Sequence, residues 1–329
     1  MPERRFEHVS ALAQAGYGPP DDATMHFLWQ IVDEGALGAS RHVALSIELL
    51  RHILDRYPDP AEALARAGMA ADFIAATRGR DTPVIGNSLA AIMAGLEAVP
   101  EMSRAARLKE RAQRWTEEQA ERKERLVARA ARHLAGACGI MAFDYSSSAA
   151  AIVVRLCAGE RPPLVVVPES RSIAGGAKYL HEFLPAGIRV RFIPDAAIEH
   201  GLAECDTVLL GVETLRADGS FLNTIGSRLI ARLARPLGIE VYGCTDLMKL
   251  DRRSYDGHRP APAIRSYDDL LLAGLDEAGL GLVDTSAPEL EVVPPDLTTA
   301  LLTEFGPVPP HAIWSLGQEV FRQTGESCG

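Results

Sequence analysis

Five acidic residues in the second half of the sequence are the first candidates for chemistry. Each follows a short apolar run, and each run leads through a turn into a helical pattern, which is the order expected of a parallel sheet. Ligands bind beyond the carboxyl ends of such strands, so these side chains are expected to gather at one edge. Crowded carboxylates oppose one another's ionisation, and one of them can then keep its proton and act as an acid. The five are Asp144, Glu169, Asp195, Glu213 and Asp246.

Two other roles are open to these residues. Asp is a favoured helix N-cap, but Glu is not, and Asp144 precedes the serines of Ser146–Ser148, which can cap a helix themselves. A divalent metal is another way to hold several carboxylates together, because hard cations prefer oxygen ligands. No histidine accompanies the acidic residues in these motifs, so a metal-dependent enzyme is the weaker alternative. We expect no metal and no other cofactor.

Two segments could hold an anion. Gly175-Gly176, after Arg171, would let backbone N–H groups approach an anion at the start of the next helix. Asp218-Gly219 predicts a turn, and Asn223–Ser227 is expected to begin a helix whose first amides and Asn223 side chain could bind a phosphate. The glycine pair matches neither Walker A nor GxGxxG, which argues against a nucleoside triphosphatase or a dinucleotide-binding enzyme.

The elements that would position these residues fall into two parts. Residues 1–135 are rich in Ala, Leu, Arg and Glu and predict a helical domain. Within it, residues 103–134 predict one long connecting helix, because this stretch alternates in charge and contains no Gly or Pro. Residues 136–329 predict a Rossmann-like, doubly wound parallel sheet. The expected strands are 139–143, 164–168, 189–193, 207–211, 240–243 and a later one near Leu270–Leu275, with helices at 148–156, 176–184 and 224–234.

Composition narrows the class of protein. The chain has 329 residues, 47% of them hydrophobic, which is enough for two ordinary cores. A net charge of −10 argues against broad nucleic-acid binding, which needs a basic face. No apolar run is long enough to span a bilayer, and no signal-peptide pattern opens the chain, so we expect a cytoplasmic protein without a membrane partner. The cysteines show neither zinc-ligand spacing nor a disulfide pattern; they are Cys138, Cys157, Cys205, Cys244 and Cys328.

The order of the motifs resembles one family, which includes methylthioribose-1-phosphate isomerase, ribose-1,5-bisphosphate isomerase and the alpha, beta and delta subunits of initiation factor 2B. The resemblance covers about residues 135–315 and rests on several short segments in the same order. A fainter match in the helical half is Gly38-Ala39-Ser40, which resembles the family's R-G-A loop with Leu37 in place of the arginine. The stronger segments are Glu169–Arg171 with Gly175-Gly176, Asp195–Ala197, Gly211–Glu213, Asp218-Gly219, Asn223–Ser227, Lys249 and Leu302–Gly306.

The sequence departs from the family at the residues that carry the isomerases' chemistry. Asp144 stands where the family has a catalytic cysteine, Glu213 where it has a catalytic aspartate, and Thr224 where a lysine contacts phosphate. An aldose–ketose isomerase needs one group to move a proton between adjacent carbons and another to shuttle one between oxygens, and two carboxylates can do both. We therefore predict that Asp144 and Glu213 form a catalytic acid/base pair.

The resemblance also implies a substrate and a partner. We expect an aldose–ketose isomerase acting on a phosphorylated or otherwise modified pentose. The alternative is a non-catalytic homodimeric module, like the initiation-factor subunits, that binds a sugar phosphate or a nucleotide. Because the relatives assemble through the C-terminal domain, a homodimer or higher homo-oligomer is expected. The implied substrate-binding residues are Gly38, Ala39, Ser146, Arg171, Gly175, Gly176, Asn223, Thr224 and Lys249.

Overall fold

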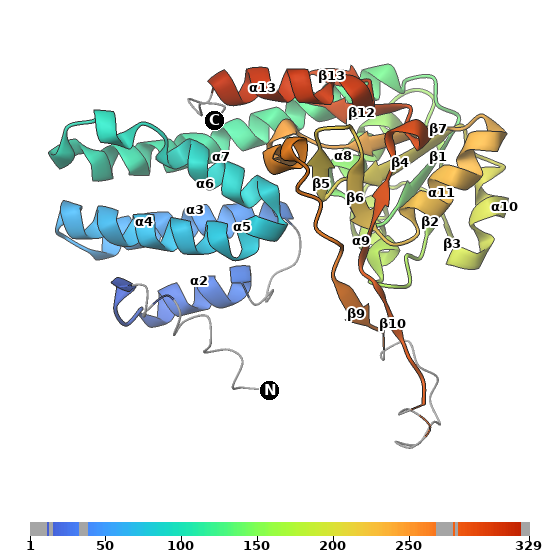
Figure 1. Cartoon of the computed structure of the whole chain (residues 1–329). Coiled ribbons are helices and arrows are strands. Elements are labelled where there is room, and N and C mark those ends of the chain that lie inside the picture. Colours follow the sequence, from blue (N-terminus) through green and yellow to red (C-terminus); the bar gives the residue numbers. More distant parts are fainter. Residues whose placement is uncertain (1–11, 13–15, 33–38, 268–278, 280–281, 324–329) are drawn as a thin grey trace. The chain divides into compact units, whose positions relative to one another are not determined.

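A computed structural model describes residues 12, 16–32, 39–267, 279 and 282–323 (Figure 1). The chain forms two compact units. The first comprises the chain up to Arg122 together with Leu247–Asp251 and the residues from Ser315 onward. The second comprises Lys123–Asp246 and Arg252–Trp314. None of the helices in the described ranges combines the length and apolar character needed to cross a membrane.

The first unit is helical because its apolar residues recur at helical spacing. Helix α3, Ala39–Arg56, buries Val43, Ile47 and Leu50 on one face. Helix α4 begins sharply because the Asp59 side chain caps it and Pro60 fits its first position. The other helices of this unit are α2 (Asp22–Val32), α5 (Arg78–Asp81), α6 (Pro83–Met93) and the 3₁₀ turns η3 (Leu96–Ala98) and η6 (Leu247–Lys249); α4 is Pro60–Ala76.

Segments far apart in the sequence complete this unit. The Asn87 side chain on α6 donates to the carbonyl oxygens of Met248 and Leu250, at 2.8 and 2.9 Å. Leu250 begins the short strand β8, Leu250–Asp251. On helix α13, Ile313–Gln323, Gly317 packs so closely against Leu250 that an added Cβ would lie 2.3 Å from its Cδ2. The helical unit is therefore completed by two segments from much later in the sequence.

One helix runs from the first unit into the second. Helix α7, Glu101–His133, confirms the long helix predicted from the sequence and is about 50 Å long at 1.5 Å per residue. Its charged face carries local ion pairs, such as those of Glu110 with Arg107 and Arg114. Leu108, Ala112 and Trp115 are buried in its first half. Toward its end Leu126, Val127 and Ala130 turn an apolar face into the core of the second unit.

A seven-stranded sheet forms the second unit and confirms the predicted doubly wound fold. Its strand order is β13-β12-β7-β4-β1-β2-β3, parallel except for the β12–β13 pair. From β1 the chain adds β2 and β3 on one side, then β4, β7 and β12 on the other, so the switch point lies between β1 and β4. The strands are β1 (Gly139–Phe143), β2 (Leu164–Pro168), β3 (Val190–Ile193), β4 (Thr207–Gly211), β7 (Glu240–Cys244), β12 (Ala300–Thr303) and β13 (Gly306–Val308).

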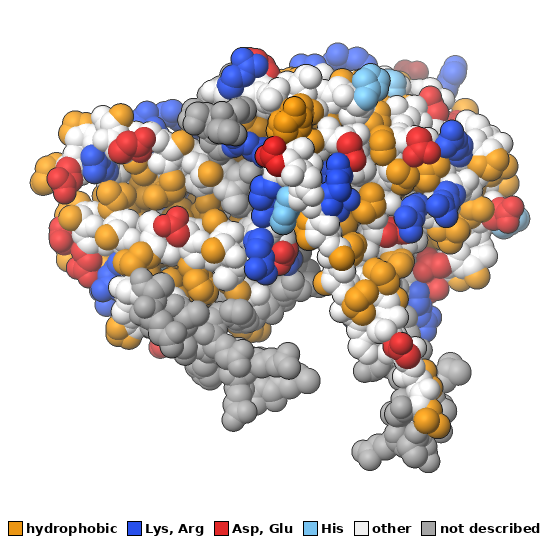
Figure 2. All heavy atoms as spheres, in the orientation of Figure 1, with side chains coloured by type: hydrophobic (Ala, Val, Ile, Leu, Met, Phe, Trp, Pro, Cys, Tyr) orange, Lys and Arg blue, Asp and Glu red, His pale blue; other side chains and the backbone are white. Residues whose placement is uncertain are grey.

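Five of the predicted strands match these strands to within one residue. The sixth, near Leu270–Leu275, falls outside the described residues, and the further parallel strand is β12. The helices of this unit are α8 (Ser147–Cys157), α9 (Gly175–Phe183), α10 (Ile198–Leu202) and α11 (Ser227–Ala234). On the face of the molecule in Figure 2, basic and acidic side chains are interspersed rather than separated by sign.

A smaller antiparallel arrangement corrects one expectation. The helix predicted to start at Thr224 starts at Ser227, because Asn223 and Thr224 end a strand that pairs with β11. Gly226 makes the change of direction with φ of 104°, at a point where a Cβ would lie 2.8 Å from the Phe143 ring. The strands that the second unit contributes to this arrangement are β5 (Thr214–Arg216), β6 (Phe221–Thr224) and β11 (Leu290–Val293), and β9 (Ile264–Ser266) pairs separately with β10 (Ser286–Pro288).

Candidate functional site

Asp144 lies at the switch point, directly after β1. Its side chain is buried, with 6% of its surface exposed. Thr224 Oγ1 donates a hydrogen bond to Asp144 Oδ2 at 2.6 Å, and Ser170 Oγ donates to Oδ1 at 3.3 Å. Side chains from the turn after β2 and from β6 thus converge on the carboxyl group that follows β1.

Burial dominates the electrostatics of this carboxyl. It raises the pKa of Asp144, because the charged form loses its contact with water. The hydrogen bonds from Thr224, Ser170 and the Tyr145 N–H favour the charged form and oppose the shift, as does the positive charge of Lys178. A carboxyl held in this balance can give up or accept a proton nearer neutral pH than an ordinary Asp.

Backbone strain is concentrated around the same carboxyl. Among the described residues, three that are not glycine have positive φ: Asp144 at 52°, Ser170 at 48° and Ala174 at 51°. Left-handed conformations are unfavourable for such residues and persist only where the surroundings enforce them. All three belong to the two turns that meet at Asp144, so the fold holds this corner in a specific geometry.

The two glycines of the second turn are required for close approach. A Cβ on Gly175 would lie 1.9 Å from Asp144 Oδ1, and one on Gly176 would lie 2.1 Å from the Pro168 carbonyl oxygen. The predicted glycine pair therefore lies beside the predicted acid. Its observed role is to admit the carboxyl group and the strand end, and both residues begin α9.

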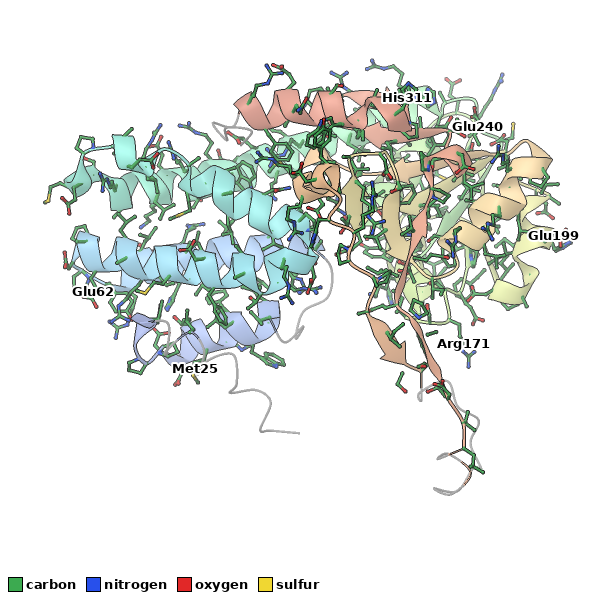
Figure 3. The ribbon with its side chains drawn as sticks, in the orientation of Figure 1. Met25, Glu62, Arg171, Glu199, Glu240 and His311 are labelled. Atoms are coloured by element: carbon green, nitrogen blue, oxygen red, sulfur yellow. The ribbon has the colours of Figure 1, made fainter. Side chains whose placement is uncertain are left out.

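Asp195 supports this turn rather than facing outward. Its two carboxylate oxygens accept from the N–H groups of Ser170 and Arg171, at 2.9 and 2.8 Å. The Arg171 side chain is 65% exposed, pairs with Glu169 at 3.7 Å and points away from the sheet (Figure 3). Of the five acidic residues, Asp195 thus has a structural role.

Glu213 follows the neighbouring strand. Phe143 of β1 pairs with Leu210 of β4, so Asp144 and Glu213 lie beyond adjacent strand ends. The Glu213 N–H donates to the Leu222 carbonyl at 2.8 Å, which fixes its backbone. Its side chain is half-buried, and no described residue forms a hydrogen bond or an ion pair with its carboxylate.

Ser146 and Asn223 line the same strand ends. Ser146 Oγ caps α8 through the Ala149 N–H at 3.4 Å. Asn223 Nδ2 donates to Ser227 Oγ at 2.9 Å, and its Oδ1 lies 3.2 Å from where a Cβ on Gly211 would be. The structure therefore brings together the predicted residues Asp144, Ser146, Gly175, Gly176, Asn223 and Thr224.

The predicted phosphate site at the next helix is filled by the protein itself. Glu291 Oε1 accepts from the N–H groups of Gly226 and Arg228, at 2.7 and 2.9 Å, and the Arg228 side chain reaches Oε2 at 3.3 Å. The expectation that the first amides of this helix are available to a phosphate is wrong, because a carboxylate from β11 satisfies them. No local sequence pattern predicts this contact, because Glu291 lies 65 residues from Gly226.

Three predicted residues lie elsewhere. Gly38 lies outside the described residues. Ala39 is the first residue of α3, and Lys249 ends η6, both in the helical unit. Their part in substrate binding stays a prediction. Among the residues that the structure describes, no group of three or more His, Cys, Asp or Glu side chains is arranged to hold a metal ion.

The fold and the site define a class: a doubly wound α/β protein with a buried, hydrogen-bonded carboxyl at its switch point. A family model described as the Initiation factor 2 subunit family matches residues 39–310. The chain belongs to this family, which confirms the resemblance found in the motifs.

The relatives and solved structures agree with this assignment. The chain is 27% identical over 288 residues to a ribose 1,5-bisphosphate isomerase of Haloterrigena turkmenica, covering 85% of this chain and 87% of that protein. It is 33% identical over 190 residues to one of Haloferax volcanii, covering 55% and 56%. Two structures from Pyrococcus horikoshii share its fold. A 5-methylthioribose 1-phosphate isomerase has a TM-score of 0.74 at 22% identity, covering 90% of this chain and 88% of that one. A translation initiation factor eIF-2B has 0.73 at 20%, covering 88% and 98%.

Proposed function

We propose that this protein is an aldose–ketose isomerase that acts on a phosphorylated pentose, with Asp144 and Glu213 as its acid/base pair. The observation that carries the proposal is the Asp144 corner, where burial, two side-chain hydrogen bonds and three left-handed residues converge on one carboxyl. Relatives named as isomerases of ribose 1,5-bisphosphate and methylthioribose 1-phosphate support the substrate class.

The reaction requires two kinds of hydrogen movement. For a pentose that carries phosphate on C1, the C1–ring oxygen bond breaks and the ring oxygen gains a proton. The hydrogen on C2 moves directly to C1 with its bonding electrons, replacing the bond to the ring oxygen, and the C2 hydroxyl loses its proton as the carbonyl forms. The proton that leaves O2 balances the one that the ring oxygen gains, so a donor and an acceptor are sufficient.

The two carboxyl groups suit these two roles. Asp144, whose raised pKa favours its protonated form, is the proposed donor to the ring oxygen. Glu213, half-buried and without a side-chain partner in the described part of the chain, is the proposed acceptor for the O2 proton. Ser146, Asn223 and the start of α9 would position the sugar.

Turnover of ribose 1,5-bisphosphate and methylthioribose 1-phosphate, followed by NMR in deuterated water, tests the proposal. We expect a ketose product from one of them in the parent protein. Asp144→Asn and Glu213→Gln should each lower turnover by about 10²–10⁴-fold, the range typical of general acid or base residues. Asp218→Asn, an exposed acid in the turn before β6, is the matched control and should retain activity.

A non-catalytic sugar-phosphate or nucleotide-binding module is the second candidate. It is favoured by the contacts of Asp144, since both its oxygens already accept hydrogen bonds. Thermal unfolding with the two sugar phosphates and with AMP separates the candidates. A ligand at about 100 times its dissociation constant adds about 2.7 kcal/mol of stability, whether or not it is turned over. A shift without a product would support the module, and turnover that survives both substitutions would refute our assignment of the acid/base pair.

We further propose that the protein forms a homodimer through its second unit. The solved tetrameric complex of eIF2B beta and delta subunits from C. thermophilum, to which this chain is 16% identical, supports assembly in proteins of this fold. Light scattering after size-exclusion chromatography should give twice the chain mass of 35.4 kDa.

A further inference from the structure

The Asp144–Thr224 hydrogen bond joins residues 80 positions apart, and both side chains are buried, Asp144 at 6% and Thr224 at 4% exposure. At 2.6 Å this bond has the length of a charge-assisted hydrogen bond between a hydroxyl donor and a carboxylate acceptor. Thr224 therefore holds Oδ2 tightly. The strand β6 that carries Thr224 is itself fixed by its pairing with β11.

The other oxygen of Asp144 has a longer side-chain hydrogen bond. Ser170 Oγ lies 3.3 Å from Oδ1, near the upper limit for a hydrogen bond. Oδ1 also lies against the first turn of α9, where Gly175 has no Cβ to cover it. The two oxygens of one carboxyl group are thus unequal: one is tied to a strand and the other faces a turn and a helix start.

We propose that Thr224 is a positioning residue for Asp144, which fixes Oδ2 and leaves Oδ1 as the oxygen that exchanges a proton with the substrate. This inference rests on the proposed function of Asp144. It assigns Thr224 a role different from the substrate contact predicted from the sequence. It also assigns Ser170, held in place by Asp195, a weaker contact that the substrate can displace.

The pKa of Asp144 depends on the groups that surround its carboxyl. They are the Thr224 and Ser170 hydroxyls, the Tyr145 N–H and the Lys178 ammonium group. Tyr179 on α9 also lies within electrostatic range of Asp144, and Cys244 on β7 lies within electrostatic range of Tyr179. Thr224 and Ser170 donate to the ionised carboxylate, so removing either donor makes ionisation harder and moves the titration of Asp144 to higher pH.

The test compares Thr224→Val, which keeps the shape and removes the hydroxyl, with Thr224→Ser, which restores it. We expect Thr224→Val to lower turnover of the active sugar phosphate by about 10- to 100-fold and to move the Asp144 limb of the pH profile up by about 1–2 pH units, because a hydrogen bond to a charged group is lost. Thr224→Ser should return both toward the parent values. Ser170→Ala should change turnover only a few-fold.

Thr207→Val is the matched control. Thr207 is also a buried threonine that donates to an Asp, in this case to Asp206 Oδ1 at 2.9 Å, but it lies at the amino end of β4, away from the site. We expect it to change stability and leave the pH profile in place. A uniform loss of turnover in Thr224→Val without movement of the limb would overturn the positioning role. A larger loss in Ser170→Ala than in Thr224→Val would identify Oδ2 as the reacting oxygen and overturn our assignment of Oδ1.

A second readout separates this inference from the proposed function. The pH dependence of unfolding, measured for the Thr224 variants with Asp144 intact and with Asp144→Asn, reports the Asp144–Thr224 coupling without any substrate. If no sugar phosphate is turned over but Thr224→Val still moves the pH at which the Asp144 contribution levels off, the proposed function fails and the positioning of Asp144 stands. If Thr224→Val has the same effect with and without Asp144, the inference fails.

Discussion

Two neighbouring corners of the same sheet edge are built in opposite ways. At Asp144, strained turns, two glycines and two hydroxyl donors fix one buried carboxyl. At Glu213, a backbone hydrogen bond fixes the chain, and the carboxylate has no partner among the described residues. The contrast teaches that a pair of acidic residues predicted as equivalent can combine one preorganised group with one adaptable group.

The largest effect on stability is expected where the Asp144 corner is most crowded. Gly175→Ala puts a Cβ 1.9 Å from Asp144 Oδ1, so we expect a loss of about 2–4 kcal/mol in the free energy of unfolding. Adding Asp144→Ala should recover part of this loss, with a coupling of about 1–3 kcal/mol by denaturant unfolding. Gly136→Ala is the control, because a Cβ there meets nothing within 4 Å. Equal losses with and without the Asp144 carboxyl would show that the two residues are not in contact.

The support beneath this corner should come next. Asp195→Asn replaces one acceptor oxygen by an NH₂ group that faces a backbone N–H, so we expect a loss of about 1–3 kcal/mol. Glu291→Gln makes the same change at the start of α11 and should be destabilising to a similar degree. If the geometry of Ser170 depends on Asp195, only the Asp195 variant should also disturb the titration of Asp144. Both effects can be measured by denaturant unfolding across a pH series.

Asp144→Asn should change how stability depends on pH. Below the ordinary Asp pKa of 3.8 the carboxyl is protonated in both the folded and the unfolded chain and makes no difference. As pH rises above that value the unfolded chain ionises more readily than the folded one, so the parent loses stability until pH exceeds the raised folded pKa. The Asp144→Asn variant lacks this loss. Its free energy of unfolding should therefore rise relative to that of the parent through that pH window and stay higher by a constant amount above it. A parent–variant difference that moves the other way would mean that the folded pKa is lowered.

The smallest effect is expected at the adaptable corner. Glu213→Gln removes a charge that no described side chain pairs with, so the free energy of unfolding should change by less than about 0.5 kcal/mol. We expect this substitution to lower turnover instead. A loss of stability comparable to that of Asp195→Asn would show that Glu213 is held as firmly as the other carboxylates, and the contrast would disappear.

The strands and the long helix could be predicted because their signals are local. A buried parallel strand such as β1 is an unbroken apolar run, and α7 is a long stretch without Gly or Pro. The acidic residues beyond the strands followed from the same pattern. The contacts that decide their roles could not be predicted, because Thr224 and Glu291 meet their partners across 80 and 65 residues. Asn223 and Thr224 were misassigned to a helix because a four-residue strand carries too little periodicity to compete with the helical pattern that follows.

The segments that close the helical unit determine when it can finish folding. Most of this unit is synthesised first, and N-terminal domains generally fold first as the chain emerges. Here the unit also needs Leu247–Asp251, which Asn87 holds, and α13, whose Gly317 packs on Leu250. Leu247–Asp251 follow β7 in the sequence, and α13 follows β13. The five strands β1, β2, β3, β4 and β7 can therefore pair before either closing segment is made, and helices made early complete their packing only after these strands are available.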